Sequence, residues 1–244
     1  MHHISDTQHR YCSGQTAKGL KMYKAVIFDF NGTLFEDYDL QEEAWRIVIR
    51  RHLDRYLEPA EFRNNIHGLG NVDILAYINS LDASKHFDIS ITDEKETIYR
   101  QICREHPERV RFVPGVTETF DALKAGGIPI AIATASEILN VNFYYEFFHL
   151  ERWFEQQHVL YDDRTFPLKP APDVYLKAME RLGTAPEDCV ICEDSKNGLL
   201  AAIASGAGRV IARHDKTSSG KMFSDPKIYA VIEDFTGFYP KYLE

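Results

Sequence analysis

The sequence lacks the features of a membrane-spanning or nucleic-acid-binding protein. No apolar run approaches the roughly 18 residues that a membrane span needs. The formal net charge is −9, and Lys and Arg are not clustered, which argues against binding to the phosphate backbone of DNA or RNA. The polar residues 1–22 contain no apolar segment typical of a secretory signal, so we expect them to be a disordered leader.

Cysteine is also scarce. Two of the four cysteines, Cys189 and Cys192, have the C-x-x-C spacing found in some zinc and redox sites. They lie, however, in an apolar run that we expect to be a strand, where positions i and i+3 point to opposite faces. No second Cys or His pair with metal-ligand spacing accompanies them. We therefore expect reduced thiols in a cytoplasmic protein.

The hydrophobic pattern predicts an α/β fold built on a doubly wound parallel sheet. Short apolar, β-branched runs alternate with helical stretches, several of which end at glycine. Strands are expected at residues 25–28, 128–133, 158–161, 189–192, 210–212 and 229–232. Strands alternating with helices are typical of βαβ units, in which ligands bind at the carboxyl ends of the strands.

One region departs from this alternation. Between the first strand and residue 111, apolar residues recur at helical spacing and no strand pattern appears, with a first helix expected at residues 39–57. We therefore expect an all-helical domain at residues 37–111, inserted between the two parts of a core domain, residues 23–36 and 112–244.

Polar residues follow several of the predicted strands. Asp29 follows the first strand, Thr134 the second, and the pair Glu193-Asp194 comes after the apolar run at 189–192. Lys169 lies just before a predicted helix. Each group alone has an ordinary explanation as a helix cap, a loop residue or surface charge. Together, at the edge of a parallel sheet where ligands gather, they predict a functional site.

The stretches around these residues resemble the four sequence motifs of the haloacid dehalogenase superfamily. They read D-F-N-G-T-L, I-A-T-A-S, K-P-A-P-D and E-D-S-K-N-G-L-L-A-A. The predicted helical domain resembles the cap of the branch that contains β-phosphoglucomutase and many small-metabolite phosphatases. The resemblance implies a Rossmann-like core with a helical cap, and hydrolase activity that uses magnesium.

The resemblance also implies roles for individual residues. Asp29 would be the nucleophile, and Lys169 would neutralise the pair formed by this carboxylate and the substrate phosphate, which otherwise repel each other. The Thr134 hydroxyl and nearby backbone N–H groups, including that of Ala135, would bind phosphate oxygens. Oxygen ligands suit Mg²⁺. The implied magnesium site consists of Asp29, the backbone carbonyl of Asn31, and Asp194, with Glu193 beside it as a ligand or a neighbour of one.

Asn31 departs from the pattern of the family's phosphatases, which carry a second Asp at this position as the general acid and base. An amide cannot exchange a proton near neutral pH. Three explanations are open. The protein is a catalytically impaired variant, natural or engineered; another group, with Glu36 near the hinge as a candidate, handles the proton; or the substrate needs no acid, as with an acyl phosphate or a carbon–halogen bond.

The predicted cap carries two further candidates. The string H-G-L-G-N-V-D at residues 67–73 resembles the cap loop of the β-phosphoglucomutase branch. Asn71 stands where the mutase has an Arg that grips a distal phosphate, so we expect Asn71 to contact substrate but a mutase activity to be disfavoured. Trp45 is either a packing residue or a substrate contact.

The predicted function is that of a Mg²⁺-dependent phosphatase acting on a small phosphorylated metabolite, such as a sugar phosphate, through an aspartyl-phosphate on Asp29. Two alternatives remain: a catalytically impaired homologue that binds a phosphometabolite, and a dehalogenase-type hydrolase. Against the dehalogenase stands the pair Glu193-Asp194, because halide displacement needs no metal-type acidic pair. We expect no nucleic-acid or membrane partner. Neither the substrate nor the oligomeric state follows from the sequence.

Overall fold

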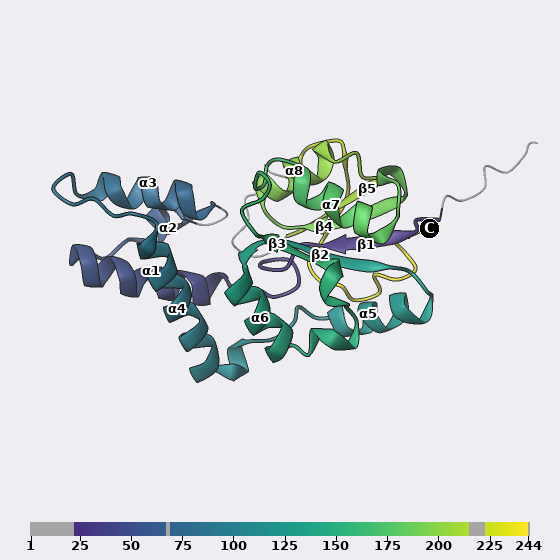
Figure 1. The fold of residues 1–244 in the computed structure, drawn as a ribbon, viewed down its shortest axis with the longest axis horizontal. Helices are drawn as coiled ribbons and strands as arrows, with labels where there is room; N and C mark the ends of the chain where they lie inside the picture. Colours follow the sequence, from purple (N-terminus) through teal and green to yellow (C-terminus); the bar gives the residue numbers. More distant parts are fainter. Residues whose placement is uncertain (1–21, 67–68, 215–222, 244) are drawn as a thin grey trace, which may run out of the picture.

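Six strands form one sheet in the computed structural model, which describes residues 22–66, 69–214 and 223–243 (Figure 1). The strand order is β3-β2-β1-β4-β5-β6, and every neighbouring pair is parallel. The strands are β1 Ala25–Phe28, β2 Ile130–Glu137, β3 Val159–Asp162, β4 Cys189–Glu193, β5 Arg209–Arg213 and β6 Ile228–Ile232. The predicted fold class is confirmed. Of the expected leader, only Met22 lies within the described residues.

Helices cover both faces of the sheet. They are α5 Val116–Ala125, α6 Ile138–Phe147, α7 Asp173–Leu182 and α8 Lys196–Ala204. In Figure 1, α5 and α6 lie below the sheet, whereas α7 and α8 lie above it. Strand β1 is buried on both faces, because Val26 and Phe28 belong to one apolar cluster while Ala25 and Ile27 belong to another. An uninterrupted apolar sequence is expected for a strand in such a position.

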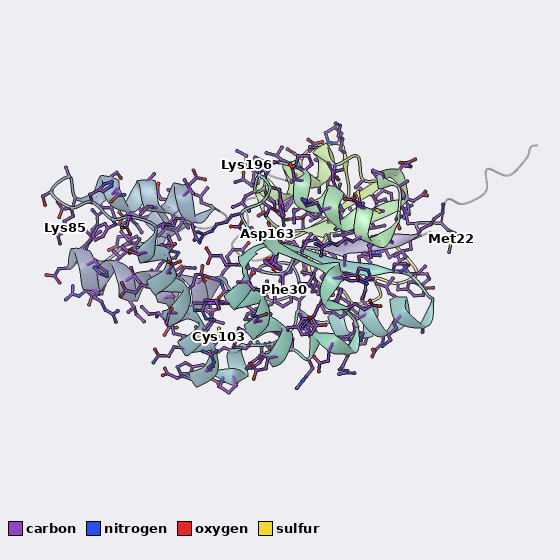
Figure 2. The ribbon with its side chains drawn as sticks, viewed as in Figure 1. Met22, Phe30, Lys85, Cys103, Asp163 and Lys196 are labelled. Carbon is purple, nitrogen blue, oxygen red and sulfur yellow. The ribbon has the colours of Figure 1, made fainter. Side chains whose placement is uncertain are left out.

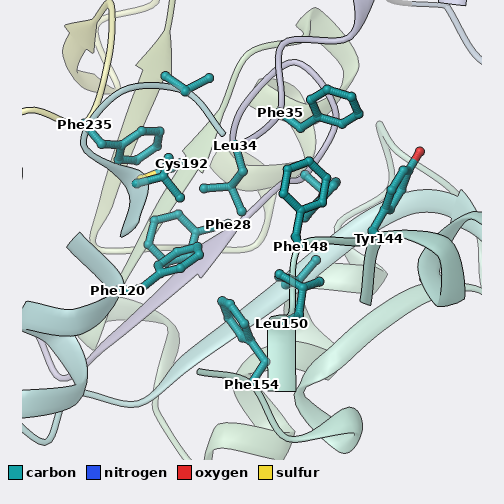
Figure 3. Close-up of a cluster of buried hydrophobic side chains, with 14 of the residues drawn as sticks. Phe28, Leu34, Phe35, Phe120, Tyr144, Phe148, Leu150, Phe154, Cys192 and Phe235 are labelled. Carbon is teal, nitrogen blue, oxygen red and sulfur yellow. The ribbon is translucent and has the colours of Figure 1, made fainter. Parts of the chain in front are cut away.

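Phe28 lies at the centre of the larger cluster (Figure 3). Its ring makes edge-on contacts with Phe120 and Phe235, at centroid distances of 5.3 and 5.9 Å. Edge-to-face geometry of this kind is favoured by the charge distribution of aromatic rings. Phe28 directly precedes Asp29, so the packing that fixes this ring also fixes the end of β1.

The two cysteines of the C-x-x-C string are buried on opposite faces of the sheet. Cys189 packs in the cluster under α7 and α8, whereas Cys192 packs in the cluster that contains Phe28. Both are free thiols, and burial raises the pKa of Cys189 to about 11. The expectation that they form neither a redox pair nor a zinc site agrees with this geometry.

Among the described residues, four α-helices between β1 and α5 form a separate helical unit beside the sheet (Figure 1). They are α1 Tyr38–Leu53, α2 Pro59–Asn65, α3 Asn71–Leu81 and α4 Ser90–Glu105. The unit has an apolar cluster of its own, made of Trp45, Val48, Ile49, Leu57, Phe62, Ile66, Ile74, Ile78 and Ile91. Lys85 of this unit and Met22 lie near opposite ends of the molecule (Figure 2). None of the helices in the described ranges has the length and apolarity needed to cross a membrane.

Two of the elements predicted above have limits that differ from the observed ones by more than one residue. The helix predicted at residues 39–57 ends at Leu53, because Asp54 adopts a left-handed conformation with φ 49° that terminates it. A second helix, α2, then begins at Pro59, a residue suited to the first turn because it lacks an N–H. The strand predicted at residues 128–133 starts at Ile130 and extends past Thr134 to Glu137, with a register shift against β3.

We expect Phe28→Ala to lower the free energy of unfolding by about 3–5 kcal/mol, because it leaves a cavity beneath the carboxyl edge of the sheet. Urea denaturation of both proteins measures this difference. Leu176→Ala is a suitable control, since Leu176 is 42% exposed on α7 and should change stability by no more than about 0.5 kcal/mol. Equal losses in the two variants would contradict the central position of Phe28.

Candidate active site

A cavity of about 500 Å³ lies between the carboxyl edge of the sheet and the helical unit. Residues from both parts line it, so the sheet supplies one wall and helices α1, α3 and α4 supply the other. The structure brings together at this cavity every site residue predicted from the sequence, namely Asp29, Asn31, Asn71, Thr134, Ala135, Lys169, Glu193 and Asp194.

Lys169 joins the ends of three strands. Its Nζ donates to Asp29 Oδ1 at 2.6 Å, to Glu193 Oε1 at 2.8 Å and to the backbone oxygen of Ala133 at 3.0 Å. Burial alone would lower the pKa of Lys169, but the charges of Asp29 and Glu193 outweigh it and raise that pKa above its ordinary value. The lysine therefore remains a cation in direct contact with the predicted nucleophile.

The oxygens of Glu193 are already engaged by protein donors. Oε2 accepts the backbone N–H groups of Asp194 and Ser195, both at 2.7 Å, and Oε1 also accepts the Tyr175 hydroxyl at 3.1 Å. A Cβ added to Gly198 would lie 1.6 Å from Oε1, so this glycine is required for the carboxylate to fit. A carboxylate with these hydrogen bonds is better suited to orienting Asp194 and Lys169 beside a metal than to binding the metal itself.

Asp29, Asp194 and Glu193 can each offer one oxygen within 4.8 Å of the others, and all three are buried. Burial is the main cause that raises the pKa of Asp29 to about 7, opposed by the charge of Lys169. Burial, followed by the charges of Glu193 and Asp29, also raises the pKa of Asp194. Three carboxylates around one ammonium leave an excess of negative charge, which a bound divalent cation would offset.

The loop after β1 makes room for the Asp194 carboxylate. Gly32 has a φ of +78°, and a Cβ there would lie 2.1 Å from Asp194 Oδ2. Asp194 Oδ1 accepts the Thr33 hydroxyl at 2.7 Å, which fixes the orientation of the carboxylate. Hard oxygen donors in a buried, negatively charged setting fit Mg²⁺, so the residues present are compatible with the implied metal.

The Asn31 amide is hydrogen-bonded at both ends. Its Nδ2 donates to Asp37 Oδ2 and to the Tyr144 hydroxyl, both at 2.8 Å, and its Oδ1 accepts the Ser136 hydroxyl at 2.8 Å. These partners require the amide to be oriented with Nδ2 towards Asp37, since a carboxylate accepts and does not donate. The side chain is therefore a fixed, neutral group, which cannot supply the proton donor that the sequence resemblance would place at this position.

Asp37, and not Glu36, is the hinge carboxylate beside Asn31. Asp37 is buried and also accepts the Tyr99 hydroxyl at 2.7 Å and the Gln41 amide at 2.9 Å, while burial raises its pKa. Glu36 instead pairs with Arg213 at 2.9 Å, with 49% of its side chain exposed. The sequence offered no signal for this, because two adjacent carboxylates in a loop have no regular periodicity that tells which one faces inwards.

The predicted phosphate-binding residues lie at the end of β2. Thr134 is buried, and its Oγ1 accepts the backbone N–H of Ser136 at 3.1 Å. Ala135 is exposed towards the cavity, where Ser136 lies beside it. A hydroxyl and consecutive backbone amides at a strand end can together bind an anion. Ser136, which also donates to Asn31, was not among the residues predicted from the sequence.

The helical unit contributes a buried cation to the other wall. Lys95 Nζ donates to Gln41 Oε1 at 2.7 Å and to Glu96 Oε1 at 2.6 Å, and lies 5.4 Å from the centre of the Trp45 ring. Trp45 is nearly fully buried in the cluster of the helical unit and also lines the cavity, so it both packs in that cluster and forms part of the cavity wall. Lys95 had no signal in the sequence beyond its place on an amphipathic helix.

Asn71 is the first residue of α3 and lines the cavity, and its contact with a substrate stays a prediction. His67, at the start of the same predicted cap loop, lies outside the described residues.

A family model described as haloacid dehalogenase-like hydrolase matches residues 23–206 of the chain. The chain belongs to this family. The resemblance found in the four motifs is thereby confirmed, and the protein is a hydrolase of the haloacid dehalogenase type.

Several relatives align over most of their length. The chain is 32% identical over 209 residues to "Protein CbbY" of Rhodobacter capsulatus, which covers 82% of this chain and 89% of that protein. It is 27% identical over 214 residues to "Phosphorylated carbohydrates phosphatase" of Thermotoga maritima, covering 86% and 94%.

Solved structures agree. A haloacid dehalogenase hydrolase from Entamoeba histolytica superposes with a TM-score of 0.79 at 31% identity, covering 87% of this chain and 94% of that one. CbbY from Rhodobacter sphaeroides, in complex with xylulose-(1,5)bisphosphate, also gives 0.79, at 25% identity and 91% and 100% coverage.

We expect Asp194→Asn to weaken Mg²⁺ binding by more than about tenfold, because a charged oxygen ligand becomes a neutral amide. Calorimetric titration of the metal-free protein with MgCl₂ measures this affinity. Asp188→Asn is the matched control, since Asp188 carries the same group but pairs with Lys24 at 2.7 Å on the surface. If both variants bind Mg²⁺ like the wild type, Asp194 is not a ligand.

Proposed function

We propose that the protein is a Mg²⁺-dependent phosphatase that hydrolyses a small phosphorylated metabolite, such as a sugar phosphate, through an aspartyl-phosphate on Asp29. One observation carries this proposal: Asp29 lies buried at the cavity floor in contact with the Lys169 ammonium, with Asp194 alongside. The names of relatives support the substrate class, since they include a phosphorylated carbohydrates phosphatase and a hexitol phosphatase.

The residues can perform the phosphoryl transfer as follows. Lys169 reduces the repulsion between the Asp29 carboxylate and the substrate phosphate, while the Thr134 hydroxyl and the N–H of Ala135 bind phosphate oxygens. Bound Mg²⁺, held by Asp29, Asp194 and the Asn31 carbonyl, would add positive charge at the same phosphate. Asp29 then attacks phosphorus as the bond to the leaving oxygen breaks, and water later cleaves the acyl phosphate to release inorganic phosphate.

The helical unit is well placed to act as a cap. We propose that residues 37–111 form this cap domain, over a core domain made of residues 23–36 and 112–244. Asn71, Trp45 and Lys95 would then face the part of the substrate that carries no reacting phosphate. Enclosure of the site would exclude bulk water from Asp29 during the first half of the reaction.

The proposed activity is limited by the lack of a proton donor and acceptor at Asn31. Asn31 can neither protonate the leaving oxygen nor deprotonate water, and both polar atoms of its side chain are hydrogen-bonded to neighbouring side chains. Substrates whose leaving group needs no proton, such as acyl phosphates, should therefore react faster than alkyl phosphates. A protein that only binds a phosphometabolite, and a dehalogenase, are the two alternatives that the test must separate.

We expect Mg²⁺-dependent turnover of at least one member of a panel of sugar phosphates and acyl phosphates, and its complete loss in Asp29→Ala. The substitution removes both the nucleophile and a metal ligand. Release of inorganic phosphate, measured with and without MgCl₂, reports this activity. Binding of phosphate esters without turnover would favour the binding protein, and chloride release from 2-haloacids would favour the dehalogenase. Turnover that survives in Asp29→Ala would exclude the covalent mechanism.

We expect Asn31→Asp to raise the turnover of alkyl phosphates by on the order of 10²-fold, because it supplies the missing acid and base. The new carboxyl would lie where Asn31 Nδ2 now lies, 2.8 Å from Asp37 Oδ2. Two carboxylates at this distance share a proton, which keeps a donor available at neutral pH. Single-turnover kinetics with an alkyl phosphate and an acyl phosphate measure the gain, which should be large only for the former.

Two further variants separate the position of the carboxyl from its charge. The double variant Asn31→Asp/Asp37→Asn keeps the charge of the wild type but exchanges amide and carboxyl, so it should also gain activity. Asp37→Asn alone leaves no carboxyl at either position and should gain none. A gain in Asp37→Asn, or a loss in both variants carrying Asn31→Asp, would show that Asn31 is adapted to different chemistry.

A further inference from the structure

The hydroxyl of Tyr38 reaches from the helical unit to a carboxylate of the sheet. Tyr38 is the first residue of α1, and its hydroxyl donates a hydrogen bond to Asp194 Oδ2. Asp194 follows β4, so the contact joins residues 156 positions apart in the chain. Tyr38 also lines the cavity that contains Asp29. The helical unit therefore touches the candidate metal site directly.

The local backbone is shaped to allow this contact. A Cβ on Gly32 would lie 2.9 Å from the Tyr38 hydroxyl oxygen as well as 2.1 Å from Asp194 Oδ2. Thr33 donates to the other oxygen, Oδ1, at 2.7 Å. Each oxygen of Asp194 thus has its own hydroxyl donor, one from the loop after β1 and one from the helical unit, and the carboxylate cannot rotate without losing one of them.

We propose that Tyr38 is a positioning residue for magnesium binding, which acts by holding Asp194 in the orientation of a ligand. This inference rests on the proposed function, because it takes Asp194 to be a metal ligand. A carboxylate oxygen has two lone pairs, so Oδ2 can accept the phenol proton and still bind a cation. Hydrogen-bond donors to a ligating group typically change metal affinity by on the order of 10–100-fold.

The position of Tyr38 in the chain gives this contact a second effect. Asp37, the preceding residue, accepts a hydrogen bond from Asn31. Two consecutive residues at the start of the helical unit therefore hold side chains of the site, namely Asn31 and Asp194. If Tyr38 raises the affinity for Mg²⁺, then by thermodynamic linkage bound Mg²⁺ favours the arrangement in which α1 lies against the site. The metal and the helical unit would stabilise each other's position.

The test is Tyr38→Phe, which removes only the hydroxyl. We expect calorimetry of the metal-free protein to show Mg²⁺ binding weakened by about tenfold or more. The Mg²⁺ concentration for half-maximal phosphatase activity should rise by a similar factor. Tyr77→Phe is the matched control, because Tyr77 donates to Glu61 Oε1 at 3.1 Å within the helical unit, away from the cavity. Its Mg²⁺ affinity should equal that of the wild type.

Thermal melting in saturating MgCl₂ and in EDTA gives an independent readout. A ligand raises the melting temperature according to its affinity, so Tyr38→Phe should gain less from Mg²⁺ than the wild type and Tyr77→Phe. Wild-type affinity in Tyr38→Phe, or a loss shared equally by Tyr77→Phe, overturns the inference and leaves the proposed function intact. A wild-type protein that binds no Mg²⁺ overturns both this inference and the metal-dependent mechanism.

Discussion

The structure of the candidate site depends on the ion pairs that Lys169 makes with Asp29 and Glu193. Three buried charges would each be costly alone, and the lysine compensates two carboxylates that come from different strands. Removal of the ammonium would leave both carboxylates uncompensated. Removal of either carboxylate would take away one of the contacts that hold the lysine side chain in its position. The pairing therefore fixes the relative positions of the ends of β1 and β4, which the proposed nucleophile and the candidate metal ligand directly follow.

The surroundings of these charges divide the site into a charged half and a neutral half. On the charged half lie Asp29, Asp194 and Lys169, which in the proposed mechanism stabilise a phosphate electrostatically. On the neutral half, the Asn31 amide is hydrogen-bonded to Asp37, Tyr144 and Ser136, so it is held in one orientation. Under the proposed mechanism, the protein keeps the features that bind and attack a phosphate, while the proton chemistry is altered at a single side chain.

Much of this could be predicted from the sequence, and the reasons are physical. Buried parallel strands are uninterrupted apolar runs, and the residues that follow them meet at one edge of the sheet. Asp29 and Asp194 could therefore be placed near Lys169 from the order of the motifs in the sequence. Contacts made by the hinge could not be predicted in this way. Asp37 and Tyr38 act through the three-dimensional approach of α1 to the sheet, and nothing in the string F-E-D-Y distinguishes Asp37 from Glu36, which pairs with Arg213 instead.

The placement of Cys189 and Cys192 on opposite faces of the sheet has a practical consequence. Each thiol is covered by a different layer of helices, and burial raises the pKa of both, so neither should react with alkylating reagents while its layer is in place. Exposure of one layer without the other would label only one of these two cysteines. Pulsed alkylation followed by peptide mass mapping could therefore follow the opening of the two sides of the molecule separately, without any introduced probe.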